Sequence, residues 1–387
     1  MKSKFFALLL ACGLAAGLLS GCGSTDTKSP ETKPEAEQNE AAGPAAPETG
    51  SPSESAAVRT IVDGNGREVE IPSVVERIVC VGVGALRYTC YAGGQDLVVG
   101  VEDYETEAGM TRMYNYVNFE KFRDLPVIGG NGEPFVEEII HVNPQVIVMS
   151  ASAKVEPDEL RDKTGIPVVV VPGSDTTLDD NAYETIRILG ELYGLEDRAA
   201  ELTDYLHGLQ DDLEARTKDV PDADKPSVYV GGVMFKGAHG FEGTEAFYGP
   251  LALIHANNLA DTTGQTGAFD IDLERVLDWD PDVIFLDFNG MDLINEDFAA
   301  NPDFYNSLSA VRNGKVYSQI SFRSFASNLE TALADTYYAA SILYPEQFAD
   351  VDIDAKTGEI FQTLLGSNPY PDLKEAGYEF REIRIGE

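Results

Sequence analysis

The chain has 387 residues, of which 43% are hydrophobic, and it carries a formal net charge of −38 at pH 7. Because one domain commonly takes about 100–200 residues, this length predicts two domains with cores of ordinary size. The excess of acidic residues argues against a nucleic-acid partner, since phosphate binding requires a basic face. A charge this far from neutral is typical of a soluble extracellular protein whose copies repel one another.

The first 21 residues have the pattern of a signal peptide. Lys2 and Lys4 precede an apolar run at residues 5–19, which has about the length of a signal-peptide core and is short for a membrane span. The run ends in Leu19-Ser-Gly-Cys22, which resembles a bacterial lipobox. The resemblance implies cleavage before Cys22 and lipidation of its thiol and amine. The alternative is ordinary secretory cleavage beside an incidental cysteine.

Residues 22–57 are expected to form a lipidated, disordered tether. After Cys22 the segment contains no aromatic residue and no Val, Ile, Leu or Met, and it is rich in Pro, Glu, Ala, Ser and Thr. Such a composition cannot bury enough apolar surface to offset the entropy that is lost on ordering. The folded part of the chain is therefore expected to begin near residue 58.

An N-terminal lobe is predicted over residues 58–178, where strand and helix patterns alternate. This order predicts a parallel α/β sheet. Residues 102–128 are expected to be a long, irregular, aromatic loop, and loops of this length are often functional. The expected elements are a hairpin at 59–62 and 67–71, strands at 77–81, 97–101 and 168–171, and helices at 85–91 and 156–164.

Two stretches of the chain, residues 137–148 and 274–285, repeat each other. Both place a Glu seven residues before a Pro and an aliphatic pair between the two. Each copy has the pattern of the last turns of a helix, a Pro-marked turn and a buried strand. The repeat predicts two similar lobes with the functional cleft between them. The Gly-rich loops that precede the two copies are residues 129–132 and 264–267.

Residues 179–225 are predicted to be linking helices with a break at Gly194. One apolar stripe at helical spacing runs along the second helix, which Pro221 and Pro226 end. A C-terminal lobe is predicted over 226–345, and a helical extension with a polar, partly ordered tail over 346–387. The elements expected in the C-terminal lobe are strands at 227–230, 282–285 and 315–318 and helices at 248–257 and 328–343.

The binding site is expected at the exits of the first strand of each lobe. In open parallel sheets, ligands bind outside the carboxyl ends of the strands, at a topological switch point. Three basic residues stand at expected cleft positions, Arg87, Lys236 and Arg323, although the chain has only 28 Lys and Arg against 66 acids. Arginine suits carboxylates and other planar anions and also stacks on aromatic rings. The alternative for each is a helix cap or a surface ion pair.

Several chemistries find no support in the sequence. Gly82-Val-Gly84 lacks the third glycine of a dinucleotide fingerprint, because Arg87 stands at that position. There is no Gly-x-Ser-x-Gly elbow, P-loop or His-Glu-x-x-His motif. Cys80 and Cys90 could form a disulfide in an exported protein, but their apolar contexts favour two buried free thiols. Two such cysteines and four scattered histidines do not predict a metal site.

From residue 58 to about 348 the chain resembles the solute-binding lipoproteins of ABC transporters, in the group for iron–siderophore, haem and cobalamin uptake. The resemblance lies in the order and spacing of features and not in any one diagnostic motif. It implies an α/β fold of two Rossmann-like lobes with mainly parallel sheets, joined by a long rigid helix (the class III type). The matching features are the lipobox, the Pro-rich tether, Thr60-Ile-Val-Asp-Gly64, the strand–Gly–helix unit at 79–91, the twin repeats, the linking helix and Asn328-Leu-Glu-Thr-Ala-Leu333.

The resemblance implies ligand capture without chemistry. An anionic metal chelate, first of all a ferric siderophore, would bind in the cleft and pass to an ABC permease dimer with its ATPase. No other cofactor is expected, and the protein is expected to be a lipid-anchored monomer on the extracytoplasmic face of the cell membrane. The expected ligand-binding residues are Arg87, Tyr88, Tyr104, Phe235, Lys236, His239, Phe322 and Arg323.

The same resemblance suggests a role for the repeat. In the family, one surface Glu on each lobe docks on arginine pockets of the permease, and Glu137 and Glu274 match those positions. Glu133, Glu138 and Glu242 are nearby competitors. The alternative is two solvated acids early in their helices, where they favour the helix dipole and need no partner.

Three other functions stay open. A corrinoid or haem is the first alternative, although the single Trp279 lies away from the strand exits. Zinc or manganese binding needs several converging histidines, whereas His141, His207 and His255 lie within or near predicted helices far from the exits. A surface enzyme is the third, and no nucleophile–base pair indicates one.

Overall fold

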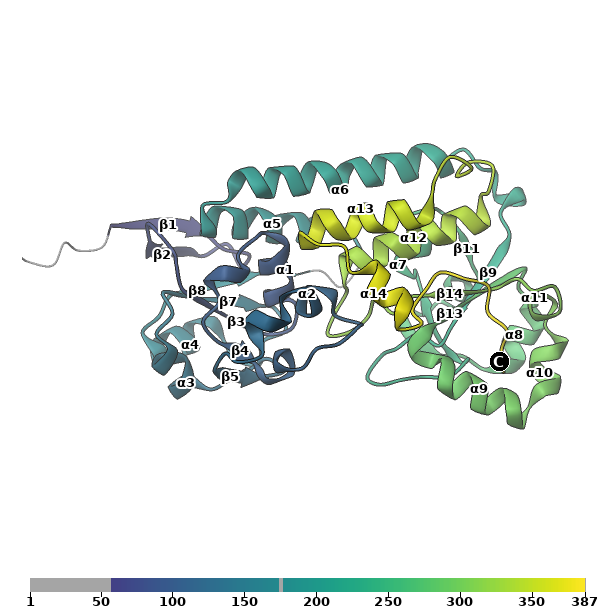
Figure 1. Cartoon of the computed structure of the whole chain (residues 1–387), viewed down its shortest axis with the longest axis horizontal. Coiled ribbons are helices and arrows are strands. Elements are labelled where there is room, and N and C mark those ends of the chain that lie inside the picture. The colour runs from purple at the N-terminus through teal and green to yellow at the C-terminus, as the bar shows by residue number, and fades with distance from the viewer. Residues whose placement is uncertain (1–56, 174–176, 387) are drawn as a thin grey trace, which may run out of the picture. The chain divides into compact units, whose positions relative to one another are not determined.

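The computed structural model describes residues 57–173 and 177–386. The predicted signal peptide, Cys22 and all but the last residue of the predicted tether lie outside these residues. Strands before residue 172 and strands after residue 226 form separate, mainly parallel sheets, and two helices connect them (Figure 1). The predicted fold class, two α/β lobes joined by a long helix, is confirmed.

A hairpin opens the N-terminal lobe, as the Asp-Gly-Asn-Gly turn predicts. β1 (Val58–Val62) pairs antiparallel with β2 (Glu68–Pro72). The buried carboxylate of Asp63 accepts hydrogen bonds from the backbone N–H groups of Asn65 and Arg67 and from the Arg67 guanidinium. It also accepts from the N–H of Val170, which fixes the turn against the main sheet of the lobe.

The main sheet of the N-terminal lobe is parallel, in the order β3 (Ile78–Val81), β7 (Val146–Ser150), β8 (Val168–Val171). All of its residues are buried, which explains the continuous apolar runs in the sequence. A second small sheet contains β4 (Val101–Glu102), β5 (Val127–Gly130) and β6 (Glu133–Pro134). The helices are α1 (Ala85–Tyr91), α2 (Met113–Phe122), α3 (Val136–Val142) and α4 (Pro157–Thr164).

Two predictions in this lobe are wrong. The strand expected at 97–101 is not continuous: Leu97 ends a short 3₁₀ turn, Val98 forms an isolated bridge to Ile78, and only Val101 belongs to β4. The irregular loop expected at 102–128 contains α2 and the start of β5. The buried carboxylate of Glu105 organises this segment, because it accepts hydrogen bonds from Tyr114 and Asn115 in the first turn of α2. That contact is tertiary and leaves no periodic signal.

Helices α5 (Asp180–Tyr193) and α6 (Glu196–Thr217) connect the lobes. The predicted break is confirmed, since Gly194 has a left-handed φ of 68° between them. α6 has 22 residues and is about 33 Å long. Its C-terminal half is fixed to later helices by Tyr337 to Asp212 (2.9 Å) and by the ion pair of Arg216 with Asp350 (2.7 Å). The predicted apolar stripe is buried at Ala199, Leu202, Leu206, Leu209 and Leu213.

The sheet of the C-terminal lobe is parallel, in the order β11 (Asn257–Asn258), β9 (Ser227–Gly231), β13 (Val283–Asp287), β14 (Val316–Gln319). A separate hairpin pairs β10 (Gly243–Ala246) with β12 (Gly267–Asp270). The predicted helix at 248–257 is shorter than expected, because α7 (Gly249–Ala252) ends before His255, which has a φ of 51°. Further helices are α8 (Leu273–Trp279), α9 (Met291–Ala300), α10 (Pro302–Ser307), α11 (Ser309–Arg312) and α12 (Leu329–Leu343).

The sequence repeat corresponds to one structural unit in each lobe, α3 with β7 and α8 with β13, as predicted. Both helices end on a residue in the left-handed region, Asn143 (φ 50°) and Asp280 (φ 41°), directly before the proline. Asn and Asp adopt this conformation more readily than most residues because their short polar side chains bond locally. The chain therefore turns into the buried strand in the same way twice.

The C-terminal segment is more ordered than the sequence suggested. It forms α13 (Ile353–Leu365) and α14 (Tyr370–Glu375), and the following residues pack against β14. The N–H of Ile383 donates to the carbonyl of Val316 (2.8 Å), and Ile383 and Ile385 are buried. The helical extension predicted after residue 346 is thus present as α13 and α14, and the tail that follows it, predicted to be partly ordered, packs against β14.

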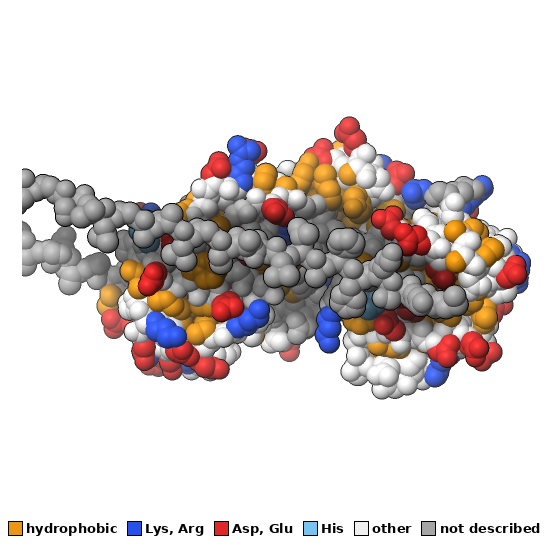
Figure 2. All heavy atoms as spheres, turned by 90° about the horizontal axis from the view of Figure 1, so that it is seen from below, with side chains coloured by type: hydrophobic (Ala, Val, Ile, Leu, Met, Phe, Trp, Pro, Cys, Tyr) orange, Lys and Arg blue, Asp and Glu red, His pale blue; other side chains and the backbone are white. Residues whose placement is uncertain are grey.

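Short 3₁₀ turns complete the fold at Gln95–Leu97, Asp103–Thr106, Asp222–Asp224, Leu259–Thr263 and Phe288–Gly290. Cys80 and Cys90 are free and buried, as predicted, and burial raises the pKa of Cys80 to about 12. No helix within the described ranges has both the length and the apolar character needed to cross a bilayer. On the face shown in Figure 2, acidic side chains and Lys and Arg side chains are interspersed.

Candidate ligand-binding cleft

A cleft of about 1040 Å³ opens at the carboxyl ends of β9, β13 and β14. This is the position at which parallel sheets bind ligands. Its walls come from the loop after β9, the end of β10, the start of β12, the exit of β13 and the loop after β14. Thr111 is the contribution of the N-terminal lobe. The lining residues are 234–237, 245–247, 267–268, Asn289, 323–326 and Thr111.

The backbone around this cleft is locally strained. The described residues include eight non-glycine residues with positive φ, and four of these line the cleft: Lys236 (53°), Phe247 (58°), Phe325 (50°) and Ala326 (67°). Left-handed conformations are costly for residues with a Cβ, and they concentrate at binding sites where the surrounding structure holds them. Phe247 and Phe325 are also 60% and 40% exposed, which is unusual for large apolar side chains.

Three charged residues line the cleft, the cations Lys236 and Arg323 and the carboxylate of Glu245. The Arg323 guanidinium binds Glu245 through two N–H···O contacts, one of them 2.6 Å long. Burial raises the pKa of Glu245, and the arginine acts against that rise. Lys236 is exposed, with no ion pair to any described residue. Two cations against one carboxylate leave the lining with one net positive charge in a strongly acidic protein.

A second layer of acids lies beneath Arg323. Asp287, at the end of β13, is 1% exposed and accepts hydrogen bonds from the Ser321 hydroxyl and from the N–H of Asn289 (2.9 Å). Burial raises its pKa to about 6. Asp335 on α12 is also buried and accepts from the N–H of Ile320 (2.8 Å), and burial raises its pKa well above the usual range. Neither carboxyl lines the cleft, but Asp287 holds the backbone of Asn289, which does.

Arg87 lies elsewhere than the sequence suggested. Its side chain is 1% exposed and does not line the cleft. It extends from α1 into the loop before α12, where its N–H groups donate to Asn328 Oδ1 (2.9 Å) and to the carbonyls of Ser327 (3.1 Å), Ser324 (2.9 Å) and Phe325 (2.5 Å). Arg87 therefore joins the two lobes and shapes the cleft through the loop that it holds.

The charge of Arg87 is compensated within the interior. Burial by itself lowers its pKa, but neighbouring Tyr114 and Tyr91 and the carboxylates of Glu330 and Glu105 outweigh that effect, so the pKa is raised. Tyr91 donates a hydrogen bond to Glu330 at the start of α12 and accepts one from the N–H of Leu329 (3.2 Å). The interlobe contact is thus a buried polar network.

A second interlobe contact supports the wall formed by Phe325. The ring of Tyr104 stacks on Phe325 with centroids 4.3 Å apart, and the guanidinium of Arg112 lies 5.3 Å from the Phe325 centroid. Arg112 also donates to the carbonyl of Tyr104 (2.6 Å), while Thr111 donates to the hydroxyl of Ser324 (3.0 Å). The segment before α2 therefore holds one side of the cleft in place.

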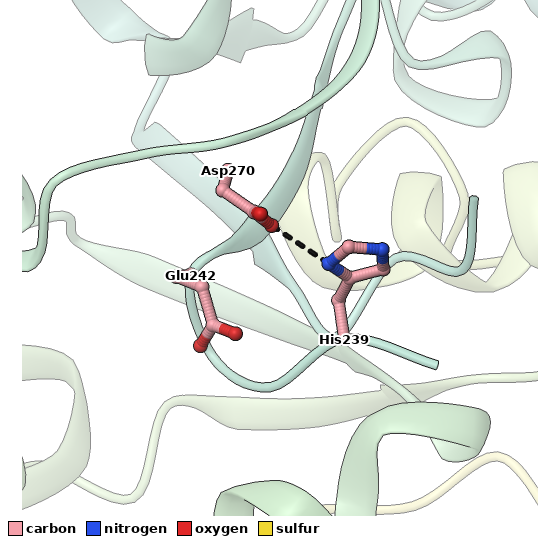
Figure 3. A group of neighbouring side chains, drawn as sticks. All are labelled: His239, Glu242 and Asp270. Carbon is pink, nitrogen blue, oxygen red and sulfur yellow. Dashed lines mark hydrogen bonds and ion pairs between the residues drawn. The ribbon is translucent and has the colours of Figure 1, made fainter. Parts of the chain in front are cut away.

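His239 lies behind the cleft wall. Its ring stacks on Phe235, with centroids 3.7 Å apart, and it does not itself line the cleft. Its Nε2 is 2.8 Å from the carbonyl oxygen of Phe235, and its Nδ1 is 2.7 Å from Asp270 Oδ1. Figure 3 shows the ring facing Asp270, with Glu242 beside the pair.

Of the eight ligand-binding residues expected from the sequence, the structure brings Phe235, Lys236 and Arg323 to the cleft. Tyr104 and His239 lie behind it, each stacked on a lining phenylalanine. The others, Arg87, Tyr88 and Phe322, are buried. Lining residues that the sequence did not indicate include Thr111, Met234, Glu245, Phe247, Asn289 and Phe325. A loop phenylalanine followed by tyrosine and glycine carries no motif that would have singled out Phe247.

Glu137 and Glu274 occupy the first turns of α3 and α8, and both side chains are exposed. Neither lines the cleft. The backbone N–H of Glu274 donates to the capping carboxylate of Asp272 (2.9 Å). The start of α8 is therefore capped by Asp272 and not by the Glu274 side chain. Both carboxylates are therefore available to a partner.

This architecture, two parallel α/β lobes joined by a long helix with a cleft at the strand exits, defines a solute-binding protein of the class III type. The chain belongs to the periplasmic binding protein family, whose pattern matches residues 91–319. Proteins of this class serve ABC transporters, and they act outside the cytoplasm.

Two curated proteins and a solved structure place the chain among known relatives. The molybdate-binding protein MolA of Haemophilus influenzae is 24% identical over 337 residues, 81% of this chain and 93% of that protein. The uncharacterized ABC transporter substrate-binding lipoprotein YvrC of Bacillus subtilis is 24% identical over 79% of this chain and 86% of its own. A periplasmic solute binding protein from Veillonella parvula matches in structure with a TM-score of 0.64 and 18% identity, covering 81% of this chain and 94% of that one.

Proposed function

We propose that this binding protein captures an anionic metal chelate, a ferric siderophore in the first instance, and delivers it to an ABC importer. The observation that carries the proposal is the size and lining of the cleft. Its volume of about 1040 Å³ is at the upper end of the range for small-molecule sites and far exceeds what a bare ion needs. Phe235, Phe247 and Phe325 offer apolar and ring surface, while Lys236 and Arg323 offer positive charge.

We propose that the mature protein is anchored to the membrane through a lipid on Cys22. The support is the signal-like residues 1–21, the Leu-Ser-Gly-Cys sequence at residues 19–22 and the tether composition that follows. The relative YvrC is described as a lipoprotein of the same class. Labelling of cells with a radioactive fatty acid tests this, because a Cys22→Ala variant should lose both the label and membrane retention.

A small oxyanion is the second candidate ligand, because the relative MolA binds molybdate. A tetrahedral oxyanion would fill only a small part of the cleft, and oxyanion sites are usually built from several convergent N–H donors. Here one of the two cleft cations, Arg323, is already bound to Glu245. These features favour the larger chelate. Corrinoid and haem remain alternatives of the same class.

The ligand can be identified from the protein purified from its own host. A Soret band in the absorption spectrum indicates haem, a broad visible charge-transfer band a ferric siderophore, and sharp corrinoid bands a cobalamin. Titration calorimetry with a ferric siderophore, haem, cobalamin and molybdate then ranks the affinities. Tryptophan fluorescence is a weak reporter here, since the single Trp279 does not line the cleft. Tighter binding of molybdate than of any chelate would overturn the proposal.

Two substitutions in the cleft are expected to weaken binding of the chelate. Lys236→Ala removes the exposed cation, and Phe247→Ala removes an exposed aromatic surface, so each should raise the Kd about tenfold, the equivalent of roughly 1.4 kcal/mol. Calorimetry measures the change. Lys154→Ala and Phe135→Ala are matched controls, since both residues are exposed and neither lines the cleft. Equal affinities for all four variants would show that the chelate does not bind in this cleft.

Docking on the permease is proposed to involve Glu137 and Glu274. Alanine at either position should lower ligand uptake by cells about tenfold, because each replacement removes one charge contact with a basic partner. Ligand affinity in calorimetry should not change, since neither side chain lines the cleft. Glu159→Ala on α4 and Asp278→Ala on α8 are the controls, being exposed acids that are not docking candidates. Equal uptake by control and test variants would show that the two glutamates are only solvated acids.

A further inference from the structure

A second group of polar side chains lies outside the cleft and has no role in the proposed capture of a chelate. His239, Glu242 and Asp270 present one nitrogen and two carboxylate oxygens that all lie within 4.8 Å of one another (Figure 3). His239 is in the loop after β9, Glu242 directly precedes β10, and Asp270 ends β12. None of the three lines the cleft.

The hydrogen bonds of the imidazole restrict what can occupy the space near Nδ1. The Phe235 carbonyl at 2.8 Å from Nε2 can only accept, so Nε2 carries a hydrogen. In the neutral ring, Nδ1 then has a lone pair, which faces Asp270 Oδ1 at 2.7 Å. Two lone pairs at this distance repel each other. The contact therefore needs a proton or a metal cation between Nδ1 and the carboxylate.

The same arrangement is the one that metal-binding histidines use. A ligating imidazole donates its other ring N–H to a carbonyl or carboxylate, which fixes the tautomer and the ring direction. Phe235 fixes both the tautomer and the ring direction of His239. Its carbonyl accepts from Nε2, and its ring stacks on the imidazole with centroids 3.7 Å apart and an interplanar angle of 7°. The nitrogen that is left faces Asp270, and the carboxylate of Glu242 lies beside the pair (Figure 3).

Backbone pairing brings the three residues of the group together. Gly243 and Asp270 are directly paired in the β10–β12 hairpin, and the N–H of Ile271 donates to the carbonyl of Glu242 (2.9 Å). The Cβ of His239 lies so close to Gly243 that a Cβ added there would be 2.5 Å away. The backbone therefore holds the three ligand-bearing residues close together, and Glu242 accepts a hydrogen bond from the N–H of Gly240 (3.1 Å).

We propose that His239, Asp270 and Glu242 form a binding site for a divalent transition-metal ion of the Zn²⁺ type, separate from the chelate cleft. One imidazole nitrogen and two carboxylates suit such an ion, and water completes a tetrahedral set. The ion relieves the repulsion between two carboxylates that lie side by side. Because Phe235 both stacks on His239 and lines the cleft, a bound ion also fixes one wall of the cleft. The site does not depend on the identity of the transported ligand.

Calorimetry with ZnCl₂ on the purified protein, freed of bound ligand and without a histidine tag, tests the site. We expect one Zn²⁺ per chain, and we expect His239→Ala and Asp270→Asn each to weaken binding at least about tenfold, as loss of a ligand does. Glu242→Gln should weaken it as well. Co²⁺ in place of Zn²⁺ should give visible absorption bands that the same variants lose.

The chain offers a matched control in a second histidine–carboxylate pair, His255 with Glu214 (Nε2 to Oε2, 2.5 Å), which has no third ligand beside it among the described residues. His255→Ala and Glu214→Gln should leave Zn²⁺ binding unchanged. If the wild type binds Zn²⁺ no more tightly than His239→Ala, a proton alone holds His239 to Asp270 and the proposal fails. If His239→Ala does not fold, the Zn²⁺ affinity of Asp270→Asn is compared with that of the wild type instead, because the Asp270 side chain is exposed.

Discussion

Replacing Arg87 with alanine is expected to lower the free energy of unfolding by about 3–5 kcal/mol, because removing one partner from a buried charged network leaves the others unpaired. The carbonyls of Ser324, Ser327 and Phe325 would each lose a charged donor, and Glu330 would lose a nearby compensating charge. Since single domains are stable by only about 5–15 kcal/mol, this is a large fraction of the total. Urea unfolding without ligand, followed by circular dichroism, measures the change.

Arg161→Ala is the control for Arg87. The Arg161 side chain is 49% exposed and pairs with the exposed Asp158 and Asp162, so its removal should leave the free energy of unfolding almost unchanged. Arg87→Lys should recover part of the loss, since it keeps the charge but not the planar set of donors. If Arg87→Ala were as stable as wild type and only lost ligand, Arg87 would be a direct ligand contact, as the sequence first suggested.

Replacing Asp287 with asparagine is expected to raise the free energy of unfolding above pH 6 by up to about 3 kcal/mol. Burial raises the pKa of Asp287 from 3.8 to about 6 in the folded protein. Between these values the folded state holds a proton that the unfolded state has lost, so stability falls as the pH rises. The contribution of Asp287 is present below pH 3.8 and is lost as the pH rises through about 6. The difference between the two pKa values corresponds to about 3 kcal/mol.

Asparagine removes the free-energy cost of a buried carboxylate because it is neutral at every pH. Its side-chain oxygen can still accept from Ser321 and Asn289. It also removes a negative charge that helps to raise the pKa of Asp335. Unfolding measured in urea from pH 4 to pH 8 should show the wild type losing stability relative to Asp287→Asn. Asp303→Asn, at an exposed site, is the control. Parallel curves for wild type and Asp287→Asn would mean that Asp287 is ionised without cost.

Much of the fold was predictable because its signals are local. The hairpin follows from Asp63-Gly-Asn-Gly66, and the helix at 85–91 was placed at its observed bounds. The break at Gly194 and the buried stripe of α6 follow from helical spacing. The elements that were misplaced depend on particular hydrogen bonds that residue periodicity does not report. α2 begins where Glu105 accepts from Tyr114 and Asn115, and the C-terminal tail is ordered by pairing with β14.

The binding site was less predictable than the fold. A strand exit rich in glycine pointed to residues 235–239, and Phe235 and Lys236 do line the cleft. Arg87 stood at the matching exit in the other lobe, but whether an arginine faces solvent or the interior depends on what lies opposite. In this protein, four oxygen atoms of the segment 324–328 lie near the Arg87 guanidinium and accept its hydrogen bonds. No property of α1 alone predicts that.

The sequence by itself determined the class of fold, two α/β lobes and a linking helix, because apolar periodicity, turn residues and a duplicated helix–strand unit are properties of short stretches. It also determined that two exposed glutamates stand at equivalent positions of the two lobes. Only the tertiary structure decided which charges reach the cleft, because burial and pairing depend on residues up to 241 positions apart, as between Arg87 and Asn328. The same physical reason explains why the group of His239, Glu242 and Asp270, drawn from three elements, was visible only after folding.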